Sequence, residues 1–299
     1  MSAPSVDTVV SGLGTTSSPD DAATPAPPVD STDDDKLTPA NVALLIGRKL
    51  GLLILQVAAA IAVWQAIVSI FSISPQVLPG PLPVWDSLIG LIRSGIVFEA
   101  GWVTLQETLL GFVIGAALGI GLAVLLTEVP VLHRLVNPYI VAFQAMPKIA
   151  VAPLLLIWFG FGMTSKVVLV VVMVFFPILV NMYTGLNSVG KDQLDLMRAY
   201  RASRWDTLRR VRIYAALPFL LASFEVSFVL ALTAAVVAEI LGSGTVVGLG
   251  TLLQMYNARV DMGGMFATVV VLSVMGMLLY ASVKMGSRYL LRWNQNPGN

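Results

Sequence analysis

The residues of this chain best suited to binding chemistry are basic and lie between Gly190 and Pro218. This stretch holds seven of the 18 Lys and Arg residues of the chain: Lys191, Arg198, Arg201, Arg204, Arg209, Arg210 and Arg212. Large apolar residues are interleaved with them at helical spacing: Leu194, Met197, Trp205, Leu208 and Val211. The pattern predicts two short amphipathic helices with a strongly cationic surface.

Three explanations fit this cationic stretch. Arginines can simply keep a loop on the cytoplasmic side of a membrane, or they can bind anionic lipid headgroups. Neither explains why large apolar side chains alternate with the arginines, whereas a groove on another protein accommodates both kinds of residue. We therefore favour protein docking.

A second set of candidate residues is polar or ionisable and lies within apolar segments. Lys148 follows Pro147 near Gln144, and Glu225 and Glu239 are 14 residues apart on one segment. Fourteen residues are close to four helical turns, so both carboxylates are expected on one side of a helix. Each intramembrane charge costs about 2.5–3.5 kcal/mol on insertion scales, which makes it a functional candidate. We expect Gln144, Lys148, Glu225 and Glu239 to line a translocation pathway; the alternatives are burial inside the bundle or, for Glu239, contact with the interface.

The sequence excludes several kinds of site. The chain has no Cys and a single His, His133, so disulfides, thiolate metal sites and histidine clusters cannot form. The run from Gly185 to Lys191 resembles a phosphate-binding loop, but Asp192 stands where Mg²⁺ needs Ser or Thr, and no strand is expected before it. We expect no catalytic residue, metal, cofactor or ATP site in this chain, and no nucleic-acid partner.

Membrane-spanning helices must position these residues. The chain is 57% hydrophobic and 12% charged, with a mean hydropathy of +0.83, and a helix needs about 20 apolar residues to cross a bilayer. The apolar runs predict an all-α membrane protein with six spans: 47–71, 101–126, 135–159, 166–188, 217–242 and 263–286. A cytoplasmic N-terminus puts 14 of the 18 basic residues on the cytoplasmic side. The positive-inside rule therefore predicts that both ends of the chain are cytoplasmic.

Composition divides the chain into three parts. Residues 1–40, rich in Ser, Thr, Pro, Ala and Asp, are expected to form a disordered acidic cytoplasmic tail. Residues 41–71 hold the first span. Residues 72–299 form a core with five spans, the cationic loop 189–216 and a short basic C-terminal tail.

Glycine and proline residues in the core predict local features of the helices and loops. Gly111, Gly115 and Gly119 recur every four residues and predict a flat helix surface on which another helix packs closely. Prolines are expected to keep the start of segment 72–100 extended, and a turn-rich loop is expected over 242–250, followed by a short stretch to Met262.

Several short motifs occur together along the chain. They are Leu78-Pro-Gly-Pro-Leu-Pro83, Ala145-Met-Pro-Lys-Ile-Ala-Val-Ala-Pro-Leu154, Trp158-Phe-Gly-Phe-Gly162, Phe176-Pro-Ile178, Ala202-Ser-Arg-Trp205, Ala215-Ala-Leu-Pro218 and Val237-Ala-Glu239. Over about residues 75–290 the chain resembles the permeases of ABC importers. The branch it is most similar to is the binding-protein-dependent type that carries taurine, alkanesulfonates, nitrate and pyrimidine precursors.

The cationic stretch resembles the conserved cytoplasmic loop of these permeases, whose pattern is Glu-Ala-Ala, a Gly six residues after the Glu, and Ile-x-Leu-Pro. Alignment on Ala202-Ser-Arg-Trp205 puts Asp195 at the Glu, Leu196 and Met197 at the two Ala, Arg201 at the Gly, and Ile213 and Tyr214 at the Leu-Pro. The Gly serves a tight turn between two short helices, so Arg201 departs from the pattern. The resemblance implies that the residues coupling the chain to an ATPase are Asp195, Met197, Arg198, Arg201, Ala202, Ser203 and Trp205.

The resemblance also implies a fold, a function and partners. The fold would be a six-span type I ABC importer permease with a cytoplasmic coupling-helix loop, in the plasma or inner membrane. Two copies would pair, each docked on a separate ATP-binding subunit that holds ATP and Mg, and an extracytoplasmic solute-binding protein would deliver a small polar or anionic organic solute. The chain itself would be a non-catalytic subunit in the lipid bilayer.

Two other classes stay open from the residues alone. An ion-coupled secondary transporter would use Glu225, Glu239 and Lys148 as a relay, but the sequence has no visible inverted repeat. The second class is a non-transporting membrane scaffold, and kinked spans and buried charges are only weak evidence against it.

Overall fold

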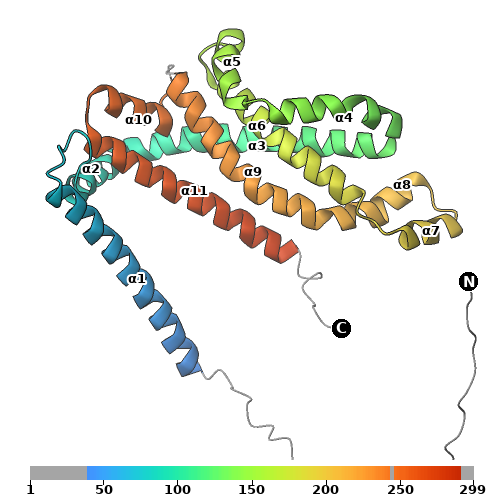
Figure 1. Ribbon diagram of the computed structural model, residues 1–299, viewed down its shortest axis with the longest axis horizontal. Helices are drawn as coiled ribbons and strands as arrows, with labels where there is room; N and C mark the ends of the chain where they lie inside the picture. The colour runs from blue at the N-terminus through green and yellow to red at the C-terminus, as the bar shows by residue number, and fades with distance from the viewer. Residues whose placement is uncertain (1–38, 243–245, 291–299) are drawn as a thin grey trace, which may run out of the picture. The chain divides into compact units, whose positions relative to one another are not determined.

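The computed structural model of the chain describes residues 39–242 and 246–290. Every regular element in this part is helical (Figure 1). The elements are α1 (Pro39–Ile70), α2 (Pro81–Ser94), α3 (Ile96–Glu128), α4 (Pro130–Ala145), η1 (Lys148–Val151), α5 (Ala152–Phe159), α6 (Met163–Leu186), α7 (Lys191–Ala199), α8 (Arg204–Thr207), η2 (Leu208–Arg212), α9 (Ile213–Leu241), α10 (Leu249–Ala258) and α11 (Met262–Leu290). The predicted acidic tail, apart from its last two residues, and the C-terminal tail lie outside the described residues.

The chain divides into two compact units, Met1–Ala58 and Ala59–Asn299. The described part of the first unit is the N-terminal portion of α1. The second unit holds the rest of α1 and all the other helices, and it contains both candidate functional regions.

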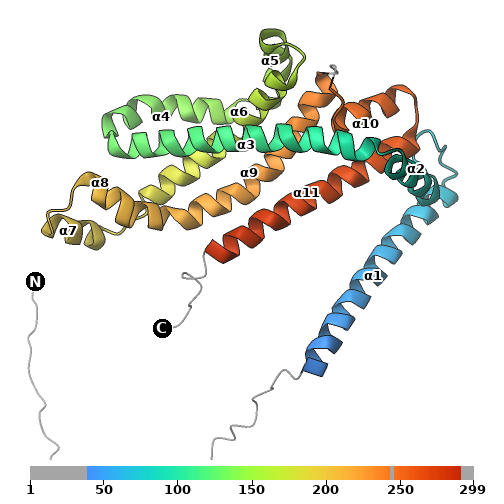
Figure 2. The same cartoon turned by 180° about the vertical axis from the view of Figure 1, so that it is seen from behind.

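Helices α3, α6 and α9 form the centre of the second unit (Figure 2). The predicted glycine surface lies between α3 and α6, since a Cβ on Gly111 would come within 2.4 Å of the Val170 Cβ and one on Gly119 within 2.9 Å of the Phe175 carbonyl oxygen. The small residues thus let two helix backbones approach closely. The predicted close packing is confirmed.

Apolar helices overlap the predicted spans, and four or five of those described are long enough to cross a membrane. Within the described residues, four helical stretches are long and apolar enough to cross a membrane: Ile96–Glu128, Met163–Leu186, Arg204–Leu241 and Met262–Leu290. Helices α4 and η1–α5 together form a fifth candidate, and Ile54–Ile70 of α1 is a shorter apolar helix.

The predicted span 135–159 is not one straight helix. It is broken after Ala145, and the two halves are bent by 88°. Met146 at the break has an extended backbone, with φ −72° and ψ 138°. The residue before a proline is pushed out of the helical region, so Pro147 explains the break.

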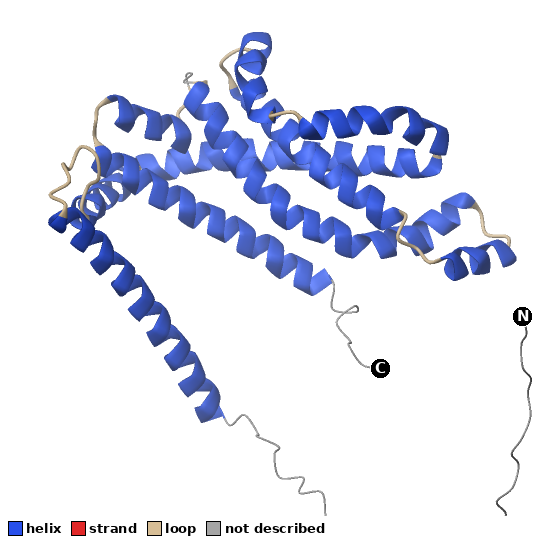
Figure 3. Cartoon of the chain, in the orientation of Figure 1, coloured by secondary structure: helices blue, strands red, loops and turns tan. Residues whose placement is uncertain are grey.

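The structure contains two helices between the spans that the sequence analysis did not predict. Prolines at 81 and 83 do not keep the chain extended; they stand in the first turn of α2, where proline lacks only an amide that would be unpaired anyway. The stretch after Gly248 is also helical, as α10. Both helices lie at the same end of the second unit, and α7 and α8 lie at the opposite end (Figure 3). These are called the α10 end and the α7–α8 end.

Candidate functional sites at the two ends of the bundle

At the α7–α8 end, a tight turn joins the two short helices of the cationic loop. The Ala202 amide donates to the Met197 carbonyl oxygen (3.0 Å) and the Arg201 amide to that of Arg198 (2.9 Å). This pair of bonds closes α7 as a Schellman motif, in which the residue at the position of Arg201 takes a left-handed conformation. Arg201 has φ 52°. The turn expected from the family's glycine is present, but an arginine forms it.

The start of α8 is fixed by a side-chain cap. The Ser203 hydroxyl accepts a hydrogen bond from the Asp206 amide (3.1 Å) and donates one to the Asp206 carboxylate (2.5 Å). A capped first turn stabilises a helix this short. The Schellman turn and the cap together hold α7 and α8 in a defined relation.

The loop presents both charge and apolar surface to solvent. Trp205 is 65% exposed, and Leu196 and Tyr200 are also exposed. Asp195 pairs with Arg198 at 2.8 Å on the surface of α7. Of the five predicted apolar loop positions, Leu208 is buried in the core, while Met197 and Val211 line a groove of about 520 Å³ between α7 and the start of α9. All seven predicted coupling residues therefore lie on one short, exposed segment.

The loop is joined directly to the core. Helix α8, the π-helical turn η2 and α9 form one helical stretch from Arg204 to Leu241. π-Helical turns are uncommon and frequently occur at functional sites. One continuous helical backbone therefore joins α8 to Glu239 at the far end of α9.

At the α10 end, Glu239 is the centre of a buried hydrogen-bond network. Its carboxylate accepts hydrogen bonds from the Thr104 hydroxyl (2.7 Å) and from the Gly250 amide. Thr104 in turn accepts from the Leu249 amide (2.8 Å). These bonds satisfy the first amides of α10 and fasten it to α3 and α9.

The glycines of the loop before α10 make this contact possible. A Cβ on Gly248 would lie 1.9 Å from a Glu239 carboxylate oxygen, and one on Gly250 would lie 2.6 Å from the Val236 carbonyl oxygen. A side chain at either position would displace the carboxylate or the backbone beside it.

A buried ion pair stands beside this network. The Lys166 ammonium is 2.9 Å from the Glu107 carboxylate, and both side chains are at most 1% exposed. Glu107 also interacts with Glu239. Two carboxylates and one ammonium thus share one site among α3, α6 and α9.

The sequence analysis did not single out Glu107, and it put Lys166 at the outer boundary of the predicted span 166–188. Glu107 lies in a strongly apolar segment four residues before Gly111, so the same cost of an intramembrane charge that identified Glu225 and Glu239 could have found it. Lys166 was misplaced because α6 begins three residues earlier, at Met163.

The four predicted pathway residues do not form one site. The Lys148 ammonium donates to the Gln144 carbonyl oxygen (3.3 Å) and lies 5.4 Å from the ring centre of Phe176. Glu225 is half-buried midway along α9, and Glu239 is fully buried in the α10 network. Their role in transport stays a prediction.

Comparison with known proteins decides the family. Residues 111–290 match the family described as binding-protein-dependent transport system inner membrane component. This chain belongs to that family. It is a multi-pass membrane permease subunit, a non-catalytic component of an ABC importer, and permeases of this family work with an ATPase partner. The match does not support the alternative of an ion-coupled secondary transporter.

Several relatives of this permease are named for solutes of the predicted branch. It is 33% identical over 230 residues to a probable ABC transporter permease protein of Haemophilus influenzae, covering 77% of this chain and 92% of the relative. It is 29% identical to the putative aliphatic sulfonates transport permease SsuC of Bacillus subtilis (80% and 86% covered). It is 33% identical to the formylaminopyrimidine transport permease ThiX of Halalkalibacterium halodurans (74% and 87% covered). The predicted resemblance to permeases for sulfonates and pyrimidine precursors is confirmed.

The fold also matches a solved transporter. A chain of the inward-facing MetNI methionine ABC transporter superposes with a TM-score of 0.56 at 21% identity, covering 63% of this permease and 93% of that chain. The predicted type I importer permease fold is confirmed.

Proposed function

We propose that this permease carries a small polar or anionic organic solute, of the sulfonate, nitrate or pyrimidine-precursor kind, into the cell through the plasma or inner membrane. It would work as a homodimer with both chain ends cytoplasmic. A separate ATP-binding subunit would hold ATP and Mg and dock on residues 190–214, and an extracytoplasmic solute-binding protein would deliver the solute at the α10 end.

The observation that carries this proposal is the continuity between the exposed loop and the core. Trp205 and Asp195 are exposed on a segment held rigidly by the Schellman turn and the Ser203 cap. The part of that segment that begins at Arg204 runs without a break into α9. A docked ATPase that moves α8 would therefore move α9 together with α3 and α6, which are packed on it, a rigid-body motion of the kind that alternating access requires.

A double variant tests the docking. Asp195→Arg with Trp205→Glu reverses a surface charge and places a carboxylate where an apolar ring is exposed, so we expect loss of ATPase-subunit binding and of uptake. The control is Arg288→Gln, an exposed position outside the docking segment 190–214. Normal uptake by the first variant, inserted at wild-type level, would contradict docking through this segment.

The proposed charge of the solute rests on Lys148. Its ammonium contacts a carbonyl oxygen and an aromatic ring, and within the described residues no carboxylate lies within ion-pair distance. An uncompensated cation in the membrane favours an anion beside it. We expect Lys148→Ala to lower the uptake rate while leaving the assembly intact, and an unchanged rate would reduce Lys148 to a structural residue.

A further inference from the structure

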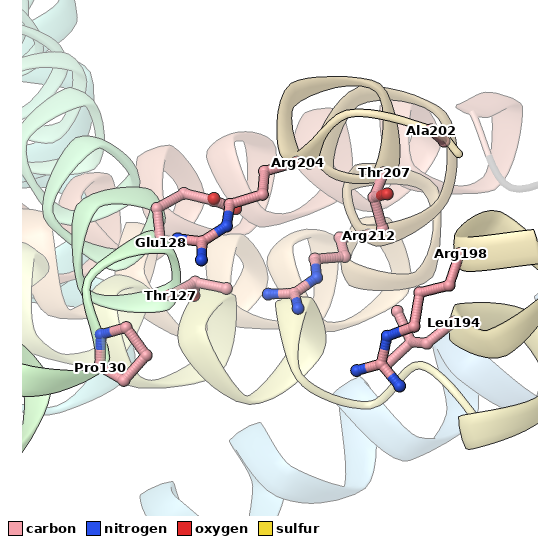
Figure 4. Close-up of a pocket in the computed structure, with 9 residues that line it drawn as sticks. All are labelled: Thr127, Glu128, Pro130, Leu194, Arg198, Ala202, Arg204, Thr207 and Arg212. Atoms are coloured by element: carbon pink, nitrogen blue, oxygen red, sulfur yellow. The ribbon is translucent and has the colours of Figure 1, made fainter.

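A cavity of about 530 Å³ lies at the α7–α8 end, on a different side of the loop from the groove beside Met197. One wall is the corner where α3 ends and α4 begins, at Thr127 and Glu128. The other wall is the cationic loop. Figure 4 shows the guanidinium groups of Arg204 and Arg212 extending from the loop toward that corner.

The cavity has an excess of positive charge. Three arginines line it, Arg198, Arg204 and Arg212, against the single carboxylate of Glu128. Arg198 already pairs with Asp195. Within the part of the chain that the structure describes, neither Arg204 nor Arg212 has a carboxylate within 4.0 Å. Two guanidinium groups therefore face the cavity without a salt-bridge partner.

The position of the cavity along the bundle indicates which kind of anion can reach it. Helix α3 is apolar enough to span the membrane and ends at Glu128, and α4 begins at Pro130. The cavity thus lies where the spans leave the hydrocarbon, at the level of the lipid headgroups.

Guanidinium groups are well suited to binding the phosphate of a lipid headgroup. Their planar donors match the oxygens of a phosphate in a bidentate arrangement, and they are less strongly hydrated than an ammonium. We propose that this cavity binds a phosphate group, supplied by an anionic phospholipid of the adjacent leaflet, through Arg204 and Arg212. The cavity is larger than a phosphate group and leaves room for the glycerol of the headgroup and for water.

A bound headgroup would give the loop a second function. The arginines of the cavity side would tie α8 and η2 to the membrane surface, while Trp205 and Asp195 stay exposed for a protein partner. The site does not depend on the transported solute, but it shares Arg198 and Ala202 with the predicted coupling residues of the docking segment.

The test compares two double variants with equal loss of charge. Arg204→Gln with Arg212→Gln removes both cavity cations. Lys191→Gln with Arg209→Gln removes two loop cations that do not line the cavity. The full chain is purified in mild detergent, titrated with phosphatidylglycerol or phosphatidylcholine, and the bound lipid is counted by native mass spectrometry. Inorganic phosphate is added in a parallel arm as the soluble source of the same group.

We expect the wild type and the control to retain phosphatidylglycerol in preference to phosphatidylcholine. At about 1 kcal/mol for each cation near a membrane surface, the cavity variant should bind phosphatidylglycerol about thirtyfold more weakly. Inorganic phosphate should not displace the lipid from the wild type.

Three results would overturn the proposal. Equal losses in the two variants would show a general charge effect without a site. Binding of inorganic phosphate that depends on Arg204 and Arg212, without any preference between the lipids, would assign the cavity to a soluble anion. Unchanged lipid binding with lost ATPase-subunit binding in the cavity variant would assign these arginines to the protein interface.

Discussion

The two ends of the bundle use charge in opposite ways. At the α10 end, Glu107, Lys166 and Glu239 are at most 1% exposed and are surrounded by helices α3, α6 and α9. At the α7–α8 end, the members of the Asp195–Arg198 pair are more than half exposed, and two further arginines lack a carboxylate partner in the described residues. The buried cluster is closed on itself, whereas the exposed one is open to other molecules.

This difference supports the interpretation that the α10 end is a rigid attachment between helices and that the α7–α8 end is a surface for binding other molecules. Buried charges persist only where partners satisfy them, and removing one partner is costly. Exposed ion pairs contribute little to stability, which supports the proposal that the cationic loop serves binding. Since one helical stretch joins the two ends, a partner bound at the loop can act on a rigid attachment point at Glu239.

The largest effect is expected from breaking the buried cluster. Lys166→Met leaves two neighbouring carboxylates without their cation and should destabilise the protein by about 3–5 kcal/mol. Denaturation of the purified protein in detergent measures the loss. Lys191→Met, at the exposed start of α7, should change little.

A second substitution sharpens this test. Adding Glu107→Gln to Lys166→Met removes one of the two carboxylates, so we expect at least half of the lost stability to return. If Lys166→Met and Lys191→Met proved equally stable, the α10 end would not be the rigid joint described above.

A smaller effect on stability is expected from substituting alanine for a glycine at either end. Gly248→Ala puts a methyl group against the Glu239 carboxylate and should cost about 1–3 kcal/mol through overpacking. Gly190→Ala, at the N-cap of α7, meets nothing within 4 Å and has an ordinary φ of −61°. Its stability should fall by less than about 1 kcal/mol, the cost of replacing glycine with alanine at an N-cap. Thermal denaturation of both variants checks the contrast, which fails if the two midpoints shift equally.

The smallest effect concerns the turn of the cationic loop. A left-handed conformation costs a non-glycine residue about 1–2 kcal/mol, so Arg201→Gly should stabilise the turn. Arg198→Gly, in the helical last turn of α7, should destabilise it by about 1 kcal/mol. Hydrogen exchange of peptides from 191–203 should slow in the first variant and speed up in the second. Faster exchange in both would mean that the turn does not form in the membrane.

Much of this architecture could be predicted from the sequence. Hydropathy located the spans because each must cross a fixed thickness of hydrocarbon, and the Gly111, Gly115 and Gly119 spacing found the α3–α6 contact. Motif similarity also located the tight turn at Arg201, although arginine gives no local sign of a left-handed residue.

Other features depend on contacts that the sequence does not show. Glu107 and Lys166 are 59 residues apart, and Thr104 and Glu239 are 135 residues apart. Their partnership appears only when α3, α6 and α9 pack together. The 88° break after Ala145 also needed the structure, because a proline within an apolar run is compatible with a kink as well as with a sharp bend.

The most direct test of the central claim is the composition of the native complex. The tagged permease would be isolated from its own membrane in mild detergent, and the intact assembly would be weighed by mass spectrometry. The account predicts two permease chains with two copies of an ATP-binding subunit, and loss of that subunit in the Asp195→Arg, Trp205→Glu variant. A wild-type permease that emerges alone, under conditions in which other ABC transporters remain assembled, would contradict docking at the α7–α8 end.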